Sequence, residues 1–522
     1  MLKISKNISL FLILSFAIYC ALIIGKSWDE GSYILLGKER LSYLLSLGIN
    51  KLNEPFWNSH HYPGISYTLN AFVLSLFPSK YEFEITHLFN LSISLSAVFG
   101  ISKIAKELFN KKVSTIIFVI FLLYPIYFGH MAINANDTVI TTCNVWITYL
   151  ILKYLRNQDN YKRNKYIIFI TFFLIFGSGV RLLFIGTLIP LIIFIFADIF
   201  FFKKFICKKF SIKIFFIDLV KIIISSYLLI ILFWAPTHSN IFILPFTFFL
   251  ELFSMSWAGW PLILLNEEYY FSNNPPIYYL LLNLFFKTPE YLLFLYLLSI
   301  LLIFTSNSFF KSKFENFNYK IIFILFILFF PNFLLILKIF PVYDGLRLFL
   351  FILPFFMVIP SLVIFLLIYK FQNINFKILS LISLFLFVLF IIKFLAITPY
   401  HYTYLNFFSG NFKNQSKKFE NDYWGVSLKE LIKKSKFLNQ NYNKLAICGA
   451  SPGTVKYYLK KFKYSKVRVA REDENFDFII MTNRAIFDGA DDTSNAKTCF
   501  EKYAGHNISY VKRYGLVLSQ IK

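Results

Sequence analysis

The chain has 522 residues, of which 57% are apolar and 16% are charged, and its mean hydropathy is +0.61. Soluble domains average about 45–50% apolar and about 25% charged residues. This composition excludes a soluble enzyme, a disordered chain and a disulfide scaffold, and it predicts a polytopic α-helical membrane protein. The net charge of +25 comes from Lys and Arg in short runs between apolar segments, which is typical of cytoplasmic loops rather than of a nucleic-acid-binding surface.

About eleven apolar segments are long enough for transmembrane helices, which need roughly 17–25 residues. They lie at 8–25, 85–105, 113–130, 138–155, 166–180, 182–201, 219–236, 289–306, 320–338, 348–369 and 378–397. The first also fits a signal peptide, but Trp28-Asp29-Glu30 follows it in place of a small-residue cleavage site, so we expect a retained helix.

The connections between these segments alternate in charge. Lys and Arg gather at 103–112, 156–165, 203–209 and 311–320, whereas the other connections are richer in Trp, Tyr, Pro, Asp and Glu. The positive-inside rule places the basic set in the cytoplasm. The N-terminus is therefore predicted to be cytoplasmic and, with an odd number of spans, the C-terminus to be outside.

Two domains are predicted. Residues 1–397 form the transmembrane domain, with long outer connections at 26–84 and 237–288, and within them Gly64–Phe77 and Tyr269–Leu282 are interpreted as interfacial segments. Residues 398–522 form a soluble α/β domain outside the membrane, with strands at 444–449 and 477–482 and helices at 428–438 and 453–461. Cys448 and Cys499 fall in this domain, where an oxidising compartment permits a disulfide; the sequence leaves their pairing open.

Carboxylates gather at the outer ends of the predicted spans, where charge is costly and therefore a candidate for function. Asp29 and Glu30 are adjacent, so they point to different faces of a helix, and one can serve as a general base. Asp137 ends the sequence Asn134–Asp137 and is also a candidate helix N-cap. The alternative for Asp29 and Glu30 is that they are solvated residues at the start of a loop.

Three cations lie at the same predicted end. Arg181 follows two glycines in Gly177–Arg181, Arg347 closes the stretch Val342–Arg347 that also holds Asp344, and Lys287 precedes a Thr-Pro pair. Arginine binds phosphate oxygens through a planar fork. Each cation alone also fits headgroup snorkelling, but together they favour a site for a lipid phosphate, with Asp344 as a further substrate contact.

His60 and His61 begin the cluster His60–Gly64. Adjacent histidines rarely ligate one metal together, and no HExxH or Cys/His spacing accompanies them. We expect them to donate hydrogen bonds to an anion or a sugar. No cofactor is predicted, although paired outer carboxylates leave a divalent metal open. No P-loop or GxGxxG sequence occurs in a suitable context, so we do not expect a cytosolic nucleotide to supply the energy for the reaction.

The order of these motifs resembles that of the GT-C membrane glycosyltransferases, nearest to the protein O-mannosyltransferases and the aminoarabinose transferase of lipid A, over about residues 8–397. The resemblance implies that Asp29 is the acceptor-binding base, Glu30 its partner and Asp137 the second acidic position. It also places Arg181 and Arg347 near the donor phosphate. The usual His-Pro-Pro stretch differs here, since it reads His61-Tyr62-Pro63.

The resulting hypothesis is an inverting glycosyltransferase of a bacterial inner membrane, with its C-terminal domain in the periplasm. It moves a sugar from a polyprenyl-phosphate donor to a lipid, polysaccharide or protein acceptor. One alternative is a transporter or flippase of lipid-linked sugar, which would typically show inverted repeats. Another is a ligase or polymerase of surface polysaccharide, which would carry a long outer loop rich in Arg.

Overall fold

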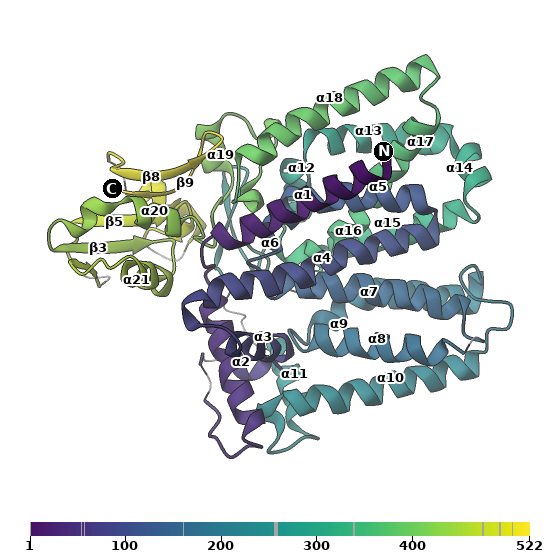
Figure 1. Cartoon of the computed structure of the whole chain (residues 1–522), viewed down its shortest axis with the longest axis horizontal. Helices are drawn as coiled ribbons and strands as arrows, with labels where there is room; N and C mark the ends of the chain where they lie inside the picture. The colour runs from purple at the N-terminus through teal and green to yellow at the C-terminus, as the bar shows by residue number, and fades with distance from the viewer. Residues whose placement is uncertain are drawn as a thin grey trace.

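The computed structural model shows a bundle of long helices with a smaller region of helices and strands at one end (Figure 1). It describes residues 2–53, 55–56, 58–159, 161–254, 259–337, 340–471, 474–489, 492–503 and 505–522. The N-terminal helix α1 (Leu2–Ile23) runs along the bundle, and the chain ends in the smaller region.

Seven helical segments are long and apolar enough to cross a membrane, judged by length and composition over the described residues. They are 79–108 with α4 (Glu82–Leu108), α7 (Asp137–Arg156), 184–202 with α9 (Phe184–Ala197) and η3 (Asp198–Phe202), α10 (Ile212–Phe233), α15 (Phe317–Ile336), 347–369 with η5 (Arg347–Ile352), α16 (Leu353–Phe356) and α17 (Val358–Tyr369), and α18 (Ile374–Ala396). An eighth candidate joins α12 (Tyr279–Lys287) to α13 (Glu290–Thr305) across a bend of 118°. The chain is a polytopic helical membrane protein.

The remaining predicted spans also contain helices, but shorter or broken ones. The apolar part of α1 is Leu10–Ile23, and α8 (Arg163–Ser178) has 16 residues. The segment 113–130 is divided into α5 (Lys111–Leu122) and α6 (Pro125–His130). Proline lacks a backbone N–H and is favoured at the first position of a helix, so Pro125 begins a new helix here. The number of eleven spans stays a prediction, and residue 338 of the ninth lies outside the described residues.

The four basic connections meet at one end of the bundle, here called the basic end. Arg156 Nη1 lies 2.7 Å from Glu107 Oε1, and the ring of Phe109 lies 5.2 Å from that of Phe314. Tyr319 donates a hydrogen bond of 2.8 Å to Asp198. The predicted grouping of these connections is therefore confirmed.

The two long connections predicted at 26–84 and 237–288 hold more structure than the sequence indicated. The first contains α2 (Glu30–Leu45), which was not predicted, and α3 (Ile65–Ser75), a helix within the predicted segment Gly64–Phe77 whose interfacial position stays a prediction. The second contains α11 (Leu244–Ser254) and an antiparallel hairpin of β1 (Leu262–Leu265) and β2 (Glu268–Phe271). The predicted interfacial segment Tyr269–Leu282 contains most of β2 and the start of α12, and its interfacial position stays a prediction.

The C-terminal region contains a five-stranded sheet in the order β4-β3-β5-β9-β8. Strand β3 pairs in parallel with β4 and β5, whereas β9 pairs antiparallel with β5 and β8. The strands are β3 (Asn443–Cys448), β4 (Val467–Val469), β5 (Phe478–Thr482), β8 (Ser509–Arg513) and β9 (Leu516–Ile521), beside the hairpin β6 (Ala485–Phe487) and β7 (Ala496–Thr498). Both predicted strands are confirmed, and Cys448 is joined to Cys499 by a disulfide.

Short elements complete the fold. The helices are α14 (Asn307–Lys313), α19 (Phe412–Lys418), α20 (Leu428–Lys434), α21 (Pro452–Lys461) and α22 (Cys499–Lys502). The 3₁₀ turns are η1 (Ser59–His61), η2 (Ser79–Tyr81), η4 (Ala235–Thr237), η6 (His401–Thr403), η7 (Phe407–Ser409), η8 (Lys436–Asn439) and η9 (Thr493–Asn495). The predicted helices at 428–438 and 453–461 correspond to α20 with η8 and to α21.

Candidate active site

Arg347 is the centre of a charge cluster at the end of the bundle opposite the basic end. Its Nε lies 3.1 Å from Asp137 Oδ2, its Nη1 lies 2.8 Å from Asp344 Oδ2, and its Nη2 lies 3.4 Å from Asp29 Oδ2. The Trp424 ring covers the guanidinium at 4.6 Å. Each nitrogen faces a different carboxylate, so the plane of the fork is fixed.

The two carboxylates expected to do chemistry are held differently. Asp29 lies one residue before α2 and is the most accessible of the three partners of Arg347, with 39% of its side chain exposed. Asp137 is the first residue of α7 and is buried. The Asn134 side chain donates a hydrogen bond of 3.0 Å to Asp137 Oδ2 and accepts one of 2.8 Å from the Asp137 backbone N–H. The N-cap of α7 is Asn136, so the prediction of Asp137 as the cap was wrong.

Arg181 and Lys287 bring two further cations with donors that are not used. Arg181, in the turn between α8 and α9, has its Nη1 3.6 Å from Asp137 Oδ1, and its buried Nε has no hydrogen-bond partner among the described residues. Lys287 ends α12, is 5% exposed and lies 5.9 Å from the Phe419 ring. Within the part of the chain that the structure describes, Lys287 has no ion-pair partner.

The sequence missed two members of the cluster, Arg484 and Glu420. Arg484 Nη1 lies 2.5 Å from Asp344 Oδ1, and its Nε lies 3.6 Å from Glu420 Oε1. Burial raises the pKa of Glu420 to about 7, although nearby Arg484 opposes the rise. The only signal in the sequence for Arg484 was an arginine two residues after the end of the buried strand β5. Because the two carboxylate oxygens of Asp344 face Arg347 and Arg484, Asp344 bridges these arginines; its predicted contact with substrate stays a prediction.

Glu30 lies apart from this cluster. Its Oε1 is 3.0 Å from His87 Nε2, its Oε2 accepts 3.0 Å from the Ser27 backbone N–H, and it is 2% exposed. Asp29 and Glu30 do point to different sides, as predicted. However, the structure does not bring Glu30 into contact with Arg347, because it faces α4 instead.

His60 and His61 lie in a third place, where η1 contacts α11. His61 Nε2 is 2.9 Å and His60 Nε2 is 3.7 Å from Glu251 Oε2. One ligand atom from each of these residues lies within 4.8 Å of the others, a spacing in which histidine and carboxylate ligands can hold a divalent metal. These three residues therefore have a candidate metal-binding geometry that the sequence did not indicate, because Glu251 was not singled out there.

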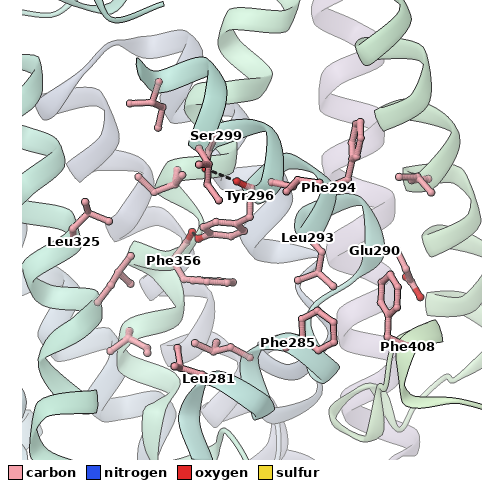
Figure 2. A pocket seen from close by; sticks show the side chains of 18 of the residues that line it. Leu281, Phe285, Glu290, Leu293, Phe294, Tyr296, Ser299, Leu325, Phe356 and Phe408 are labelled. Atoms are coloured by element: carbon pink, nitrogen blue, oxygen red, sulfur yellow. Dashed lines mark hydrogen bonds between the residues drawn. The ribbon is translucent and has the colours of Figure 1, made fainter. Parts of the chain in front are cut away.

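A cavity of about 2010 Å³ lies between α12, α13, α15 and α18. Figure 2 shows Leu281, Phe285 and Phe356 around it, with Glu290 at one side. Helix α12 carries Lys287, and the segment from η5 to α16 carries Arg347, so the elements that hold two of the cations also line this cavity. An apolar chain in the cavity would therefore lie against the same elements as the charge cluster.

No family model matches the chain, and no curated protein matches it. Among solved structures, the chain is similar to ArnT from Cupriavidus metallidurans in the apo state, with 10% identity and a TM-score of 0.48 over 99% of this chain and 98% of that one. It is also similar to ArnT from Cupriavidus metallidurans bound to undecaprenyl phosphate, with 9% identity and a TM-score of 0.48 over 99% of this chain and 97% of that one.

Proposed function

We propose that the chain is an inverting GT-C glycosyltransferase that moves a sugar from a polyprenyl-phosphate donor to an acceptor. One observation carries the proposal: cations with unused donors and a partly exposed carboxylate belong to one charge cluster at one end of a membrane bundle. The unpartnered Nε of Arg181 and the ammonium of Lys287 supply the donors, and Asp29 supplies the carboxylate. A phosphate bound to these cations would leave Asp29 free to act on the acceptor.

In the proposed reaction, an acceptor hydroxyl attacks the anomeric carbon from the face opposite the phosphate. Asp29 takes the hydroxyl proton, which is the role of a general base within hydrogen-bond reach. The bond between the anomeric carbon and the phosphate oxygen breaks, and the polyprenyl phosphate leaves with the electron pair. Fixed cations stabilise the charge that grows on the phosphate. Asp137 and Asp344 hold Arg347 in place.

The remaining parts of the proposal concern the membrane. The polyprenyl chain occupies the cavity beside α12 and α13, whose lining is mostly apolar. Eleven spans place the basic end in the cytoplasm, and the charge cluster and the C-terminal domain at the periplasmic face of a bacterial inner membrane. The reaction requires no metal at the phosphate, because three cations of the chain are there. The acceptor is a lipid, a polysaccharide or a protein.

The test compares two buried lysines at opposite ends of the bundle. Lys287 is 5% exposed in the cluster, and Lys320 is 7% exposed near the start of α15 at the basic end. We expect Lys287→Gln to weaken the binding of undecaprenyl phosphate by about tenfold, the usual order for one charged hydrogen bond. Lys320→Gln should change the Kd, measured by thermophoresis in detergent, by less than about twofold.

Undecaprenol, which lacks the phosphate, separates the headgroup from the chain. Its affinity should be unchanged by Lys287→Gln, because the alcohol offers no charge to the ammonium. A wild-type protein that does not bind undecaprenyl phosphate would overturn the proposed donor. Equal affinity of wild type and Lys287→Gln would remove Lys287 from the phosphate site.

A further inference from the structure

We propose that Arg484, from the C-terminal region, is a positioning residue of the active site. It orients Asp344 and, through Asp344, the guanidinium of Arg347. The inference rests on the proposed function, because it assigns Arg347 to the site of the donor phosphate. It means that the C-terminal region completes a site whose other charged groups come mainly from the membrane bundle.

The contact is a continuous chain of buried ion pairs. Arg484 Nη1 lies 2.5 Å from one oxygen of Asp344, and Arg347 Nη1 lies 2.8 Å from the other. The exposed fractions of the three side chains are 4%, 1% and 5%. A buried carboxylate that loses one of two such partners keeps its charge without full compensation. Asp344 would then rotate or shift toward its remaining partner, and Arg347 would shift with it.

The backbone at Asp344 makes this dependence stronger. Asp344 has a φ of 60° and Gly345 has a φ of 63°, so two consecutive residues are left-handed. This conformation is unfavourable for a residue with a Cβ and is usually held by its surroundings. The two arginines each contact a different oxygen of the Asp344 side chain. Loss of Arg484 would therefore allow the turn before η5 to relax.

Arg484 is itself held rigidly. A Cβ at Gly449 would lie 2.5 Å from Arg484 Cβ and 3.0 Å from the disulfide sulfur of Cys499. The Cys499 backbone N–H donates 3.0 Å to the Arg484 carbonyl, and the Trp260 ring covers the guanidinium at 4.3 Å. The Arg484 backbone and the face of its guanidinium are therefore both held by neighbours. Arg484 can then fix the position of Asp344 instead of moving with it.

The same C-terminal region also contacts the segment of the chain that leads to Asp29. The Lys26 backbone N–H donates 2.6 Å to the Tyr458 hydroxyl, and Lys429 Nζ donates 3.0 Å to the Ile24 carbonyl. These contacts lie on the connection that leads to Asp29. The C-terminal region thus contacts both the segment that leads to the proposed base, Asp29, and Asp344, the partner of the proposed phosphate ligand; Asp29 and Asp344 are 315 residues apart.

The experiment is a double-mutant cycle on full-length protein in detergent. We would measure the Kd of undecaprenyl phosphate for wild type, Arg484→Gln, Asp344→Asn and the double variant. Each single variant should weaken binding by about tenfold, and the double variant should bind no more weakly than the weaker single one, since both changes remove one arrangement. Arg484→Lys should recover part of the affinity. The control Arg468→Gln, whose side chain is 55% exposed in the same region, should stay within about twofold.

Wild-type affinity in Arg484→Gln, or losses that multiply to about a hundredfold in the double variant, would overturn the inference. If Arg484→Gln does not fold, Arg484→Lys decides: wild-type affinity there overturns it. A wild type that binds no undecaprenyl phosphate defeats the proposed function instead. In that case an electron-cryomicroscopy structure of Arg484→Lys tests the positioning alone. A displacement of the Arg347 guanidinium by about 1 Å, which is enough to affect a reaction, would support the inference. A guanidinium in the wild-type position would overturn the inference.

Discussion

Asp198 and the carboxylates around Arg347 lie at opposite ends of the helical bundle, and they are held differently. At the basic end, Asp198 is fully buried and accepts hydrogen bonds from the Lys204 and Phe205 backbone N–H groups and from the Tyr319 hydroxyl, at 2.8–2.9 Å. At the opposite end, Arg347 shares its donors among three carboxylates, and the Nε of Arg181 has no partner. The first arrangement is complete in itself, whereas the second has donors left for a ligand.

This difference shows that burial of charge does not by itself identify a functional site. A satisfied carboxylate such as Asp198 joins segments of the chain, and its partners are already in place. Unsatisfied buried donors cost free energy, of order 1–3 kcal/mol each. Such a cost is retained more readily where a ligand repays it. Three experiments can sharpen or break the comparison, and they follow from the largest expected effect to the smallest.

The adjacent residues Asp29 and Glu30 should respond in opposite ways. Asp29→Asn should lower turnover by about 10²–10⁴-fold, the usual contribution of a general base, with little change in the unfolding temperature because Asp29 is partly exposed. Glu30→Gln should lower the unfolding temperature, because it breaks the buried contact with His87, and should leave turnover per folded molecule within about threefold. The readouts are release of polyprenyl phosphate from a glycosylated polyprenyl phosphate and thermal unfolding. Full activity of Asp29→Asn would remove Asp29 from the base role.

At the basic end, Asp198→Asn should affect stability alone. The Asn side chain would place an NH₂ group where a carboxylate oxygen now accepts hydrogen bonds. Donor would then face donor, at a cost of about 1–3 kcal/mol. The unfolding temperature should fall, while turnover per folded molecule and the Kd of undecaprenyl phosphate should stay within about twofold. A selective loss of turnover would show that the basic end takes part in the reaction and would break the comparison.

Glu420 gives the smallest predicted effect, which depends on pH. Burial raises its pKa to about 7 from an ordinary 4.5, so the folded protein retains a proton that the unfolded chain loses. The contribution of Glu420 to stability is therefore complete below about pH 4.5 and is lost as the pH rises toward 7. Glu420→Gln imitates the protonated form. It should match wild type at pH 5 and unfold a few degrees higher at pH 8; an equal difference at both values would exclude this titration.

Some residues of the charge cluster could be predicted from the sequence, whereas the contacts of others could not. Asp29, Asp137, Arg181, Lys287, Asp344 and Arg347 were all proposed from the sequence, and the structure brings them together. They could be found because charges at the end of an apolar span are expensive and stand out against their neighbours. Glu30 was grouped with Asp29 for the same reason. Only the packing of α2 against α4 directs its side chain to His87.

The sequence by itself determined that this is a polytopic helical membrane protein and which connections share one end. Apolar composition and the distribution of Lys and Arg are properties of short segments, so they can be recognised without a fold. The tertiary structure alone decided that Arg484 joins Asp344, that Glu251 joins His60 and His61, and that Glu420 lies in the cluster. These pairs are separated by 64 to 191 residues, and their contacts depend on how the C-terminal region and α11 dock onto the bundle. Such docking is set by many packed side chains at once, and no local pattern records it.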